Sequence, residues 1–313
     1  MQSTTTSPVT IDPALARSVH SLATDAPAHG HAPTACLNCG HLVPDRFCGK
    51  CGQDAHHTKR LTMAHMLHDI PHSVWHVDKG ILYSIRTIVT RPGTTIRSYL
   101  AGQRVDHFRP LSLLLLVTGL YSFIASVLHI DMLPPRDPAM PEAVWQTQKS
   151  AIEALSKYLS WYYVGLVPVI AGFARLFLRR GGYNYAECLV IAAFITAVCN
   201  ALTLFSLPVS YYYSGTPAIQ KVAYVVSVIS IGYATWAYSA MLAHTGLSLA
   251  GRLVRGFFPF VLGVIIPPML LGMVAVGLQW DTIKQSIRKQ QQLQAQQAKS
   301  APAPAPRTVP AHQ

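Results

Sequence analysis

The sequence predicts an all-α integral membrane protein of about five transmembrane helices, with a small cysteine-rich module near its N-terminus. Charged residues make up 12% of the 313 residues and hydrophobic residues 50%, whereas a typical soluble chain is about 25% charged. The apolar residues are also gathered into a few long runs, and a run of about 20 residues crosses a bilayer as a helix. A soluble surface for a chain of this size would need more charge than this one carries.

Five apolar runs are long enough to span a bilayer, and together they define a transmembrane domain over residues 110–280. They lie at about 110–130, 158–178, 186–207, 222–242 and 257–278. Tyrosine and tryptophan near several run ends are typical of the membrane interface. Proline inside a run, as at Pro168, is tolerated in membrane helices because neighbouring groups satisfy the freed carbonyls.

The distribution of basic residues predicts the orientation. Arginines crowd the approach to the first run and recur in every second loop, and basic loops stay in the cytosol. These residues are Arg86, Arg91, Arg97, Arg104, Arg109, Arg179, Arg180, Arg252 and Arg255. The loop 131–157 mixes both signs of charge and is predicted to be external. The tail after the fifth run is basic as well, so it either lies outside or follows a re-entrant hairpin at Pro267 and Pro268.

Both ends of the chain are polar. Residues 1–35 are rich in Thr, Ser, Pro and Ala and have no apolar periodicity, which predicts a disordered tail. No apolar stretch follows Arg17, so we expect no secretory signal. Residues 281–313 are predicted to form a polar, glutamine-rich helix followed by a disordered tail with an APAPAP repeat.

Four cysteines predict a metal site between residues 36 and 59. Cys36, Cys39, Cys48 and Cys51 have the spacing C-x2-C-x8-C-x2-C. A two-residue gap lets both thiolates of a turn bind one ion, and the glycine after each second cysteine suits such a turn. Four thiolates leave no open coordination position, so we expect a structural zinc ribbon.

Three alternatives concern the same module. Two disulfides would use the same cysteines, although a cytosolic module is kept reduced. Iron would also accept four thiolates, and zinc is the expected metal. Nucleic acid is not an expected partner, because the module has few basic residues and a single aromatic, Phe47. A protein-docking or membrane-surface role is expected instead.

Residues 60–109 predict an amphipathic, interfacial helical collar between the module and the first run. An apolar face recurs at helical spacing from Ile81 to Val89, and basic residues lie on the other faces. Thr90 and Pro92 are predicted to cap and begin a second short helix, which ends at Gly102. The two helices either lie in the headgroup plane or pack directly on the spans.

The motifs of this region resemble an uncharacterised family of bacterial membrane proteins, a domain of unknown function that follows a zinc ribbon. The resemblance is carried by the double C-x2-C-G, Arg60-Leu61-Thr62, Pro92-Gly93, Tyr99-Leu-Ala-Gly-Gln-Arg104, Phe108-Arg-Pro110 and, more weakly, Tyr183-Asn-Tyr-Ala-Glu187. Gln103 departs from a Lys-Arg pair that is common in the family. The resemblance implies the bacterial inner (cytoplasmic) membrane, and it lends no activity.

A histidine stripe is one candidate for further chemistry. His65, His68, His72 and His76 follow spacings of 3, 4 and 4 residues, which would place them on one helical face. Such a stripe would hold a second metal or sense pH. Pro71 interrupts the helix, however, and a solvated or interfacial face explains the same pattern.

Two ionisable residues near the spans are the other candidates. Glu187 is the only acid at or inside a predicted span, and an intramembrane carboxylate is a functional candidate. In the first turn of a helix it would equally stabilise the helix dipole or pair with Arg179 or Arg180. Arg175 is expected to extend to the interface.

The sequence therefore favours a membrane-anchored scaffold or regulator whose zinc module docks a cytosolic or membrane protein partner. Two alternatives remain open. One is a small transporter that uses Glu187 and Arg175. The other is a membrane enzyme that acts on a lipid-linked substrate through the histidine stripe. No common hydrolase, nucleotide-binding or metalloprotease motif is present.

Overall fold

The computed structural model describes residues 34–55, 61–63, 80–133, 135–138, 140–278 and part of 280–296. The chain divides into two compact units, residues 1–57 and 58–313, which are described separately. The histidine stripe, most of the predicted N-terminal tail and the Pro/Ala tail lie outside the described residues.

The first unit is a small module built on one β-hairpin. Strand β1 (Thr34–Ala35) pairs antiparallel with β2 (Leu42–Val43), with Thr34 opposite Val43. A further bridge joins Phe47 to Asp54. The first hairpin carries one pair of cysteines at its turn, and the bridge flanks the second pair.

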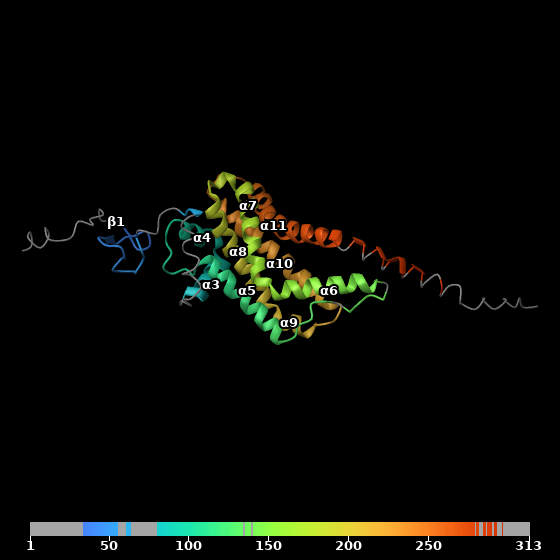
Figure 1. Ribbon diagram of the computed structural model, residues 1–313. Coiled ribbons are helices and arrows are strands. Elements are labelled where there is room, and N and C mark those ends of the chain that lie inside the picture. The colour runs from blue at the N-terminus through green and yellow to red at the C-terminus, as the bar shows by residue number, and fades with distance from the viewer. Residues whose placement is uncertain are drawn as a thin grey trace, which may run out of the picture. The chain divides into compact units, whose positions relative to one another are not determined.

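The second unit is helical in its described part. Its elements are α3 (Gly80–Thr90), α4 (Pro92–Leu100), α5 (Pro110–Val127), α6 (Glu142–Lys157), α7 (Leu159–Phe177), the 3-10 turn η1 (Arg179–Gly181), α8 (Tyr185–Phe205), α9 (Leu207–Tyr212), α10 (Ala218–Met241) and α11 (Leu249–Leu278). Figure 1 shows α8 among the other long helices, with α6 extending away from them.

Helix α8 is the centre of the second unit. Every residue from Ala186 to Ala201 is buried, and α8 packs against α5, α7 and α10. A buried hydrogen bond of 2.7 Å from the Asn200 amide to the Thr118 hydroxyl ties α8 to α5. A helix that is apolar on all sides is a core helix or a membrane span, and α8 is enclosed by its neighbours.

Helix α11 approaches its two neighbours through glycines. A Cβ on Gly256 would lie 2.6 Å from the Thr235 carbonyl oxygen of α10, and a Cβ on Gly263 would lie 2.4 Å from Ile170 of α7. Small residues at such positions let helix backbones approach closely. The helix also runs without interruption through Pro267 and Pro268, so the re-entrant hairpin considered above is wrong.

Helices α3 and α4 pack on one end of the bundle. Gly93 of α4 lies so close to Ala240 of α10 that an added Cβ would come within 2.8 Å of its side chain. Arg97 donates a hydrogen bond of 2.6 Å to the Ala240 carbonyl, and the Tyr233 hydroxyl donates one of 3.0 Å to the Ile88 carbonyl. The α4 cap is Arg91, since the Thr90 hydroxyl donates to the Arg86 carbonyl instead.

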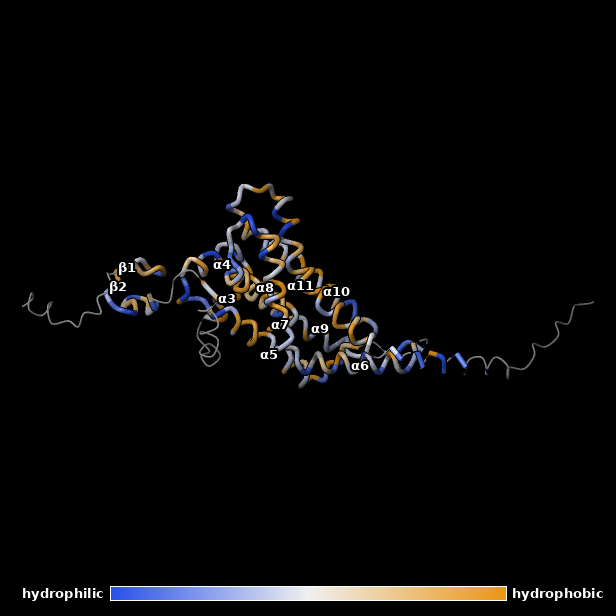
Figure 2. Tube along the Cα trace, turned by 45° about the horizontal axis from the view of Figure 1, so that its top comes forward, coloured by the Kyte–Doolittle hydropathy of each residue, from blue (hydrophilic) through white to orange (hydrophobic). Residues whose placement is uncertain are grey.

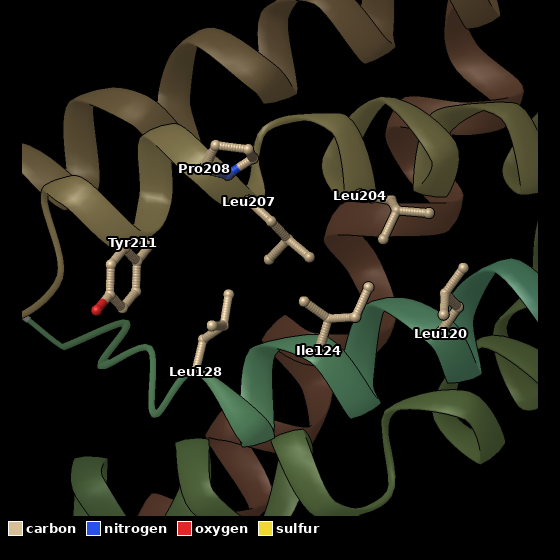
Figure 3. A pocket seen from close by; sticks show the side chains of 7 residues that line it. All are labelled: Leu120, Ile124, Leu128, Leu204, Leu207, Pro208 and Tyr211. Carbon is tan, nitrogen blue, oxygen red and sulfur yellow. The ribbon is translucent and has the colours of Figure 1, made fainter.

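The opposite end of the bundle brings α5 and α9 together. The backbone N–H of Asp131 donates to the Ser214 hydroxyl at 2.7 Å. Beside this contact an open pocket of about 450 Å³ lies between α5 and the α8–α9 junction (Figure 3), and apolar side chains and one tyrosine line it. Its lining residues are Leu120, Ile124, Leu128, Leu204, Leu207, Pro208 and Tyr211.

Four described helices are long and apolar enough to cross a membrane: α5, α8, α10 and the Leu249–Val274 part of α11. Figure 2 shows apolar residues along these helices. Only 17% of the apolar window is buried in α10 and in α11, against 78% in α8, so much of the outer apolar surface needs a non-aqueous environment. The remaining predicted span, 158–178, corresponds to α7, whose apolar part, Trp161–Phe177, is shorter than a membrane crossing by this measure.

Candidate metal centre

The two cysteine pairs have the same local backbone. The Gly40 N–H donates to the Cys36 carbonyl, and the Gly52 N–H donates to the Cys48 carbonyl, both at 2.8 Å. Both glycines have positive φ, +73° and +76°, a conformation that costs glycine little. Each C-x2-C-G sequence therefore forms one tight turn that directs two sulfurs to the same side.

The four cysteine sulfurs meet at one point. Cys36 Sγ lies 3.6 Å from Cys51 Sγ, and Cys39 Sγ lies 3.5 Å from Cys48 Sγ. All four atoms lie within 4.8 Å of one another. A tetrahedral ion with metal–sulfur bonds of about 2.3 Å requires sulfurs about 3.8 Å apart. The cluster therefore has the size and donor set to hold one metal ion.

The cysteines are free thiols rather than disulfides. All six cysteines of the chain are unbonded, and the close pairs are separated by far more than the 2.05 Å or so of a disulfide. The disulfide alternative therefore disagrees with the structure.

The pKa values of two of the four cysteines also favour a bound cation. Hydrogen bonds, first from the backbone of Cys51, lower the pKa of the Cys48 thiol to about 6. The pKa of Cys51 rises to about 12, although a backbone hydrogen bond with Gln53 lowers it, because desolvation and the three other cysteines oppose another negative charge. The Cys48 thiolate therefore forms readily, whereas a thiolate at Cys51 needs a positive ion beside it.

Within the described residues 34–55, the apolar core of the module is small. Its buried apolar cluster consists of Cys36, Val43 and Cys48. An exposed ion pair of 3.0 Å joins Arg46 to Asp54, and such pairs contribute about 0–1 kcal/mol. The cysteine ligands are therefore most of the core, as expected where a metal stabilises the fold.

The described surface of the module carries exposed apolar side chains. Leu42 is 64% exposed, Phe47 is 55% exposed and Leu37 is 49% exposed. Between residues 36 and 55 two basic residues, Arg46 and Lys50, are balanced by Asp45 and Asp54. Four thiolates on a divalent ion would add negative charge, which does not suit a phosphate backbone.

Glu187 lies in a capping box at the start of α8. Its carboxylate accepts a hydrogen bond of 2.7 Å from the Asn184 N–H, and its own N–H donates to the Asn184 side chain at 2.8 Å. The Asn184 amide also donates to the Leu61 carbonyl at 3.0 Å. In the described chain no ion pair joins Glu187 to Arg179 or Arg180. The sequence interpretation missed Asn184, although the pattern Asn-x-x-Glu is itself a signal for such a box.

The other candidate near the spans, Arg175, lies on a different helix from this box, and two further cysteines lie in α8. Arg175 is exposed in the last turn of α7. Cys188 and Cys199 are buried in α8, and Cys199 Sγ lies 3.7 Å from the Ser230 carbonyl oxygen. The structure therefore gathers the four predicted metal ligands and leaves Glu187 and Arg175 on different elements.

Comparison with known proteins gives one family match. The family described as "Protein of unknown function (DUF3667)" matches residues 78–122, which comprise α3, α4 and most of α5. No curated protein and no solved structure matches the chain. The match includes Pro92-Gly93 and the Tyr99–Pro110 motifs, and it assigns no activity.

Proposed function

We propose that this protein is a multi-pass protein of the bacterial inner membrane whose cytosolic zinc module docks a cytosolic or membrane protein partner, as a scaffold or regulator. The observation that carries the proposal is the closed cluster of four cysteine sulfurs, all within 4.8 Å. Four thiolates leave no position for a substrate, and therefore stabilise a fold rather than catalyse a reaction.

The choice of zinc follows from the donor set. Four thiolates in a tetrahedral arrangement suit zinc and iron, and zinc is the common ion in structural sites of this spacing. The exposed apolar residues of the module, Leu37, Leu42 and Phe47, supply contact area for a protein partner. Iron or an alternative metal would be detected by elemental analysis.

The proposal includes five membrane crossings, by the four long apolar helices and by the shorter α7. Helix α5 ends beside Ser214, as the Asp131 contact shows, whereas α8 begins beside Met241, whose carbonyl accepts from the Tyr183 hydroxyl at 2.9 Å. Ser214 precedes α10 and Met241 is its last residue, so the two lie at opposite ends of this helix. The chain between α5 and α8, which contains α7, must therefore run back along the bundle. Arginines at the α8 end favour that end as cytosolic.

The proposal does not extend to transport or catalysis. The carboxylate of Glu187 caps α8, and the pocket beside α9 is lined by apolar side chains and a tyrosine. Neither observation favours a transported ion or a reaction over the structural interpretation.

The test is a crosslinking capture from native membranes with the full chain. Wild type and Cys199→Ser should capture the same partner and contain one zinc ion per chain by elemental analysis. Cys48→Ser should lose both the zinc and the partner. Capture of the same partner by the zinc-free variant would refute the docking role, and a chain that stays dissolved without detergent would refute the membrane assignment.

A further inference from the structure

Five arginines lie within six sequence positions of a contact between the end of α7 and the first third of α11. Phe177, the last residue of α7, stacks on Phe258 of α11 with ring centroids 5.0 Å apart, so the end of α7 lies beside this part of α11. The charged residues within six positions of this contact on either segment are all arginine: Arg175, Arg179, Arg180, Arg252 and Arg255.

In the described chain these arginines have no carboxylate partner. The ion pairs of the second unit lie elsewhere, at Arg136, Lys149 and Lys284. Arg255 donates to the Gly251 carbonyl at 3.0 Å, and the Nε of Arg252 is buried without a hydrogen-bond partner. The described residues therefore leave these five arginines without a negative partner, and a bound anion would supply one.

The position of two of these arginines adds to the demand for an anion. Arg252 and Arg255 lie in the first two turns of α11, and its first turn has no acidic residue. Because the N-terminus of a helix carries partial positive charge, arginines there are repelled rather than stabilised. A bound anion would interact favourably both with the arginines and with the positive end of the helix.

The residue type also points to phosphate. Between residues 80 and 278 the lysines are Lys149, Lys157 and Lys221, which lie on α6 and in the first turn of α10. The positive-inside rule is satisfied by lysine as well as by arginine. Arginine differs in its planar fork, which binds phosphate through two parallel hydrogen bonds.

Apolar side chains lie directly beside the arginines. Leu253, Val254 and Phe257 are exposed on α11, between and after Arg252 and Arg255. A soluble phosphate would leave these side chains uncovered. A phospholipid would place its phosphate on the arginines and its acyl chains along this apolar surface.

We propose that this cluster binds the phosphate of an anionic phospholipid headgroup. The inference rests on the proposed placement of α7 and α11 in a membrane. It assigns the start of α11 a defined ligand class, beyond general attraction of a basic protein surface to a bilayer.

The test is native mass spectrometry of the full chain in detergent, titrated with phosphatidylglycerol or with phosphatidylcholine of the same acyl chains. Wild type should bind phosphatidylglycerol more tightly. Arg252→Gln with Arg255→Gln should weaken that binding by about fivefold for each arginine. The matched control, Lys149→Gln with Lys157→Gln, removes the same charge from α6 and should bind as wild type does.

Three results would overturn the proposal. They are equal binding of the two lipids, equal loss in the lysine control, and displacement of phosphatidylglycerol by millimolar inorganic phosphate, which would assign the cluster to a soluble anion. If the glutamine variant fails to fold, Arg252→Lys with Arg255→Lys decides: several-fold weaker binding supports bidentate recognition, and unchanged binding refutes it. A chain that needs no detergent would refute the membrane proposal separately.

Discussion

The module and the helical unit of this chain are held together by different means. In the described part of the module, residues 34–55, the buried cluster is two cysteines and a valine. In the helical unit one apolar cluster joins residues of α3, α4, α5, α7, α8, α10 and α11. A small unit without an apolar core needs a metal or crosslinks to fold, whereas a bundle with a continuous core does not.

Cysteine itself shows the contrast most directly. Cys36 and Cys48 are buried against other sulfurs, while Cys188 and Cys199 are fully enclosed in α8. In the first setting the thiol is a ligand, and in the second it is a small apolar residue. The neighbours of a cysteine, rather than its burial, therefore decide its role.

The largest expected effect is loss of metal from the module alone. Cys48→Ser removes one of four ligands, and structural zinc sites of small domains contribute about 10–16 kcal/mol of binding free energy. We expect metal content to fall from one ion per chain to none, while helix content by circular dichroism stays the same. Cys199→Ser is the matched control and should keep its metal. A metal-loaded Cys48→Ser protein would show that the cysteine cluster is not the site.

The next effect concerns the packing of the helical unit. Gly256→Ala places a Cβ against backbone atoms of Thr235 and Ser239, which cannot move as a side-chain end can. We expect overpacking to cost about 1–3 kcal/mol and to lower the thermal midpoint in detergent. Gly272→Ala, on the same helix with nothing within 4 Å, should leave the midpoint unchanged or raise it. If both variants behave alike, α10 and α11 are not packed as closely as described.

A smaller effect is expected at the start of α8. Asn184→Ala removes the acceptor for the Glu187 N–H and the donor to the Leu61 carbonyl. Loss of an N-cap costs about 0.5–2 kcal/mol, so the thermal midpoint should fall by less than in Gly256→Ala. Asn184→Asp keeps the cap acceptor and should lie between wild type and alanine. A midpoint for the alanine variant equal to that of wild type would contradict the role of the box.

The sequence predicts the parts of this fold that depend on composition and local spacing. Apolar runs mark α5, α8 and α10 to within a few residues, and two C-x2-C-G sequences predict four sulfurs at one point. Helix α11 begins at Leu249, eight residues before the predicted run, because the charges of Arg252 and Arg255 predict a loop there. Helix α6 lies in a segment predicted only as a loop, because its residues form no apolar run.

Contacts between distant segments could not be predicted in the same way. Gly93 and Arg97 both meet Ala240, more than 140 positions along the chain, and nothing local at either end specifies the other. Gly93 and Gly256 lie so close to another helix that a side chain would not fit, and this close approach is visible only in the folded structure. The capping box of α8 is the exception, since Asn184 and Glu187 are three residues apart and form a local signal.

The smallest expected effect distinguishes two roles of Glu187, its hydrogen bond in the capping box and its negative charge. Glu187→Gln keeps an oxygen that accepts the Asn184 N–H, and glutamine also serves at this position of a capping box. We expect the thermal midpoint to change by less than in Asn184→Ala, because the change weakens only the interaction with the helix dipole, about 0.3–1 kcal/mol. Metal content should not change, because Glu187 belongs to the helical unit. A drop larger than that of Asn184→Ala would mean that the negative charge, rather than the hydrogen bond, is what α8 requires, and it would return Glu187 to the functional candidates.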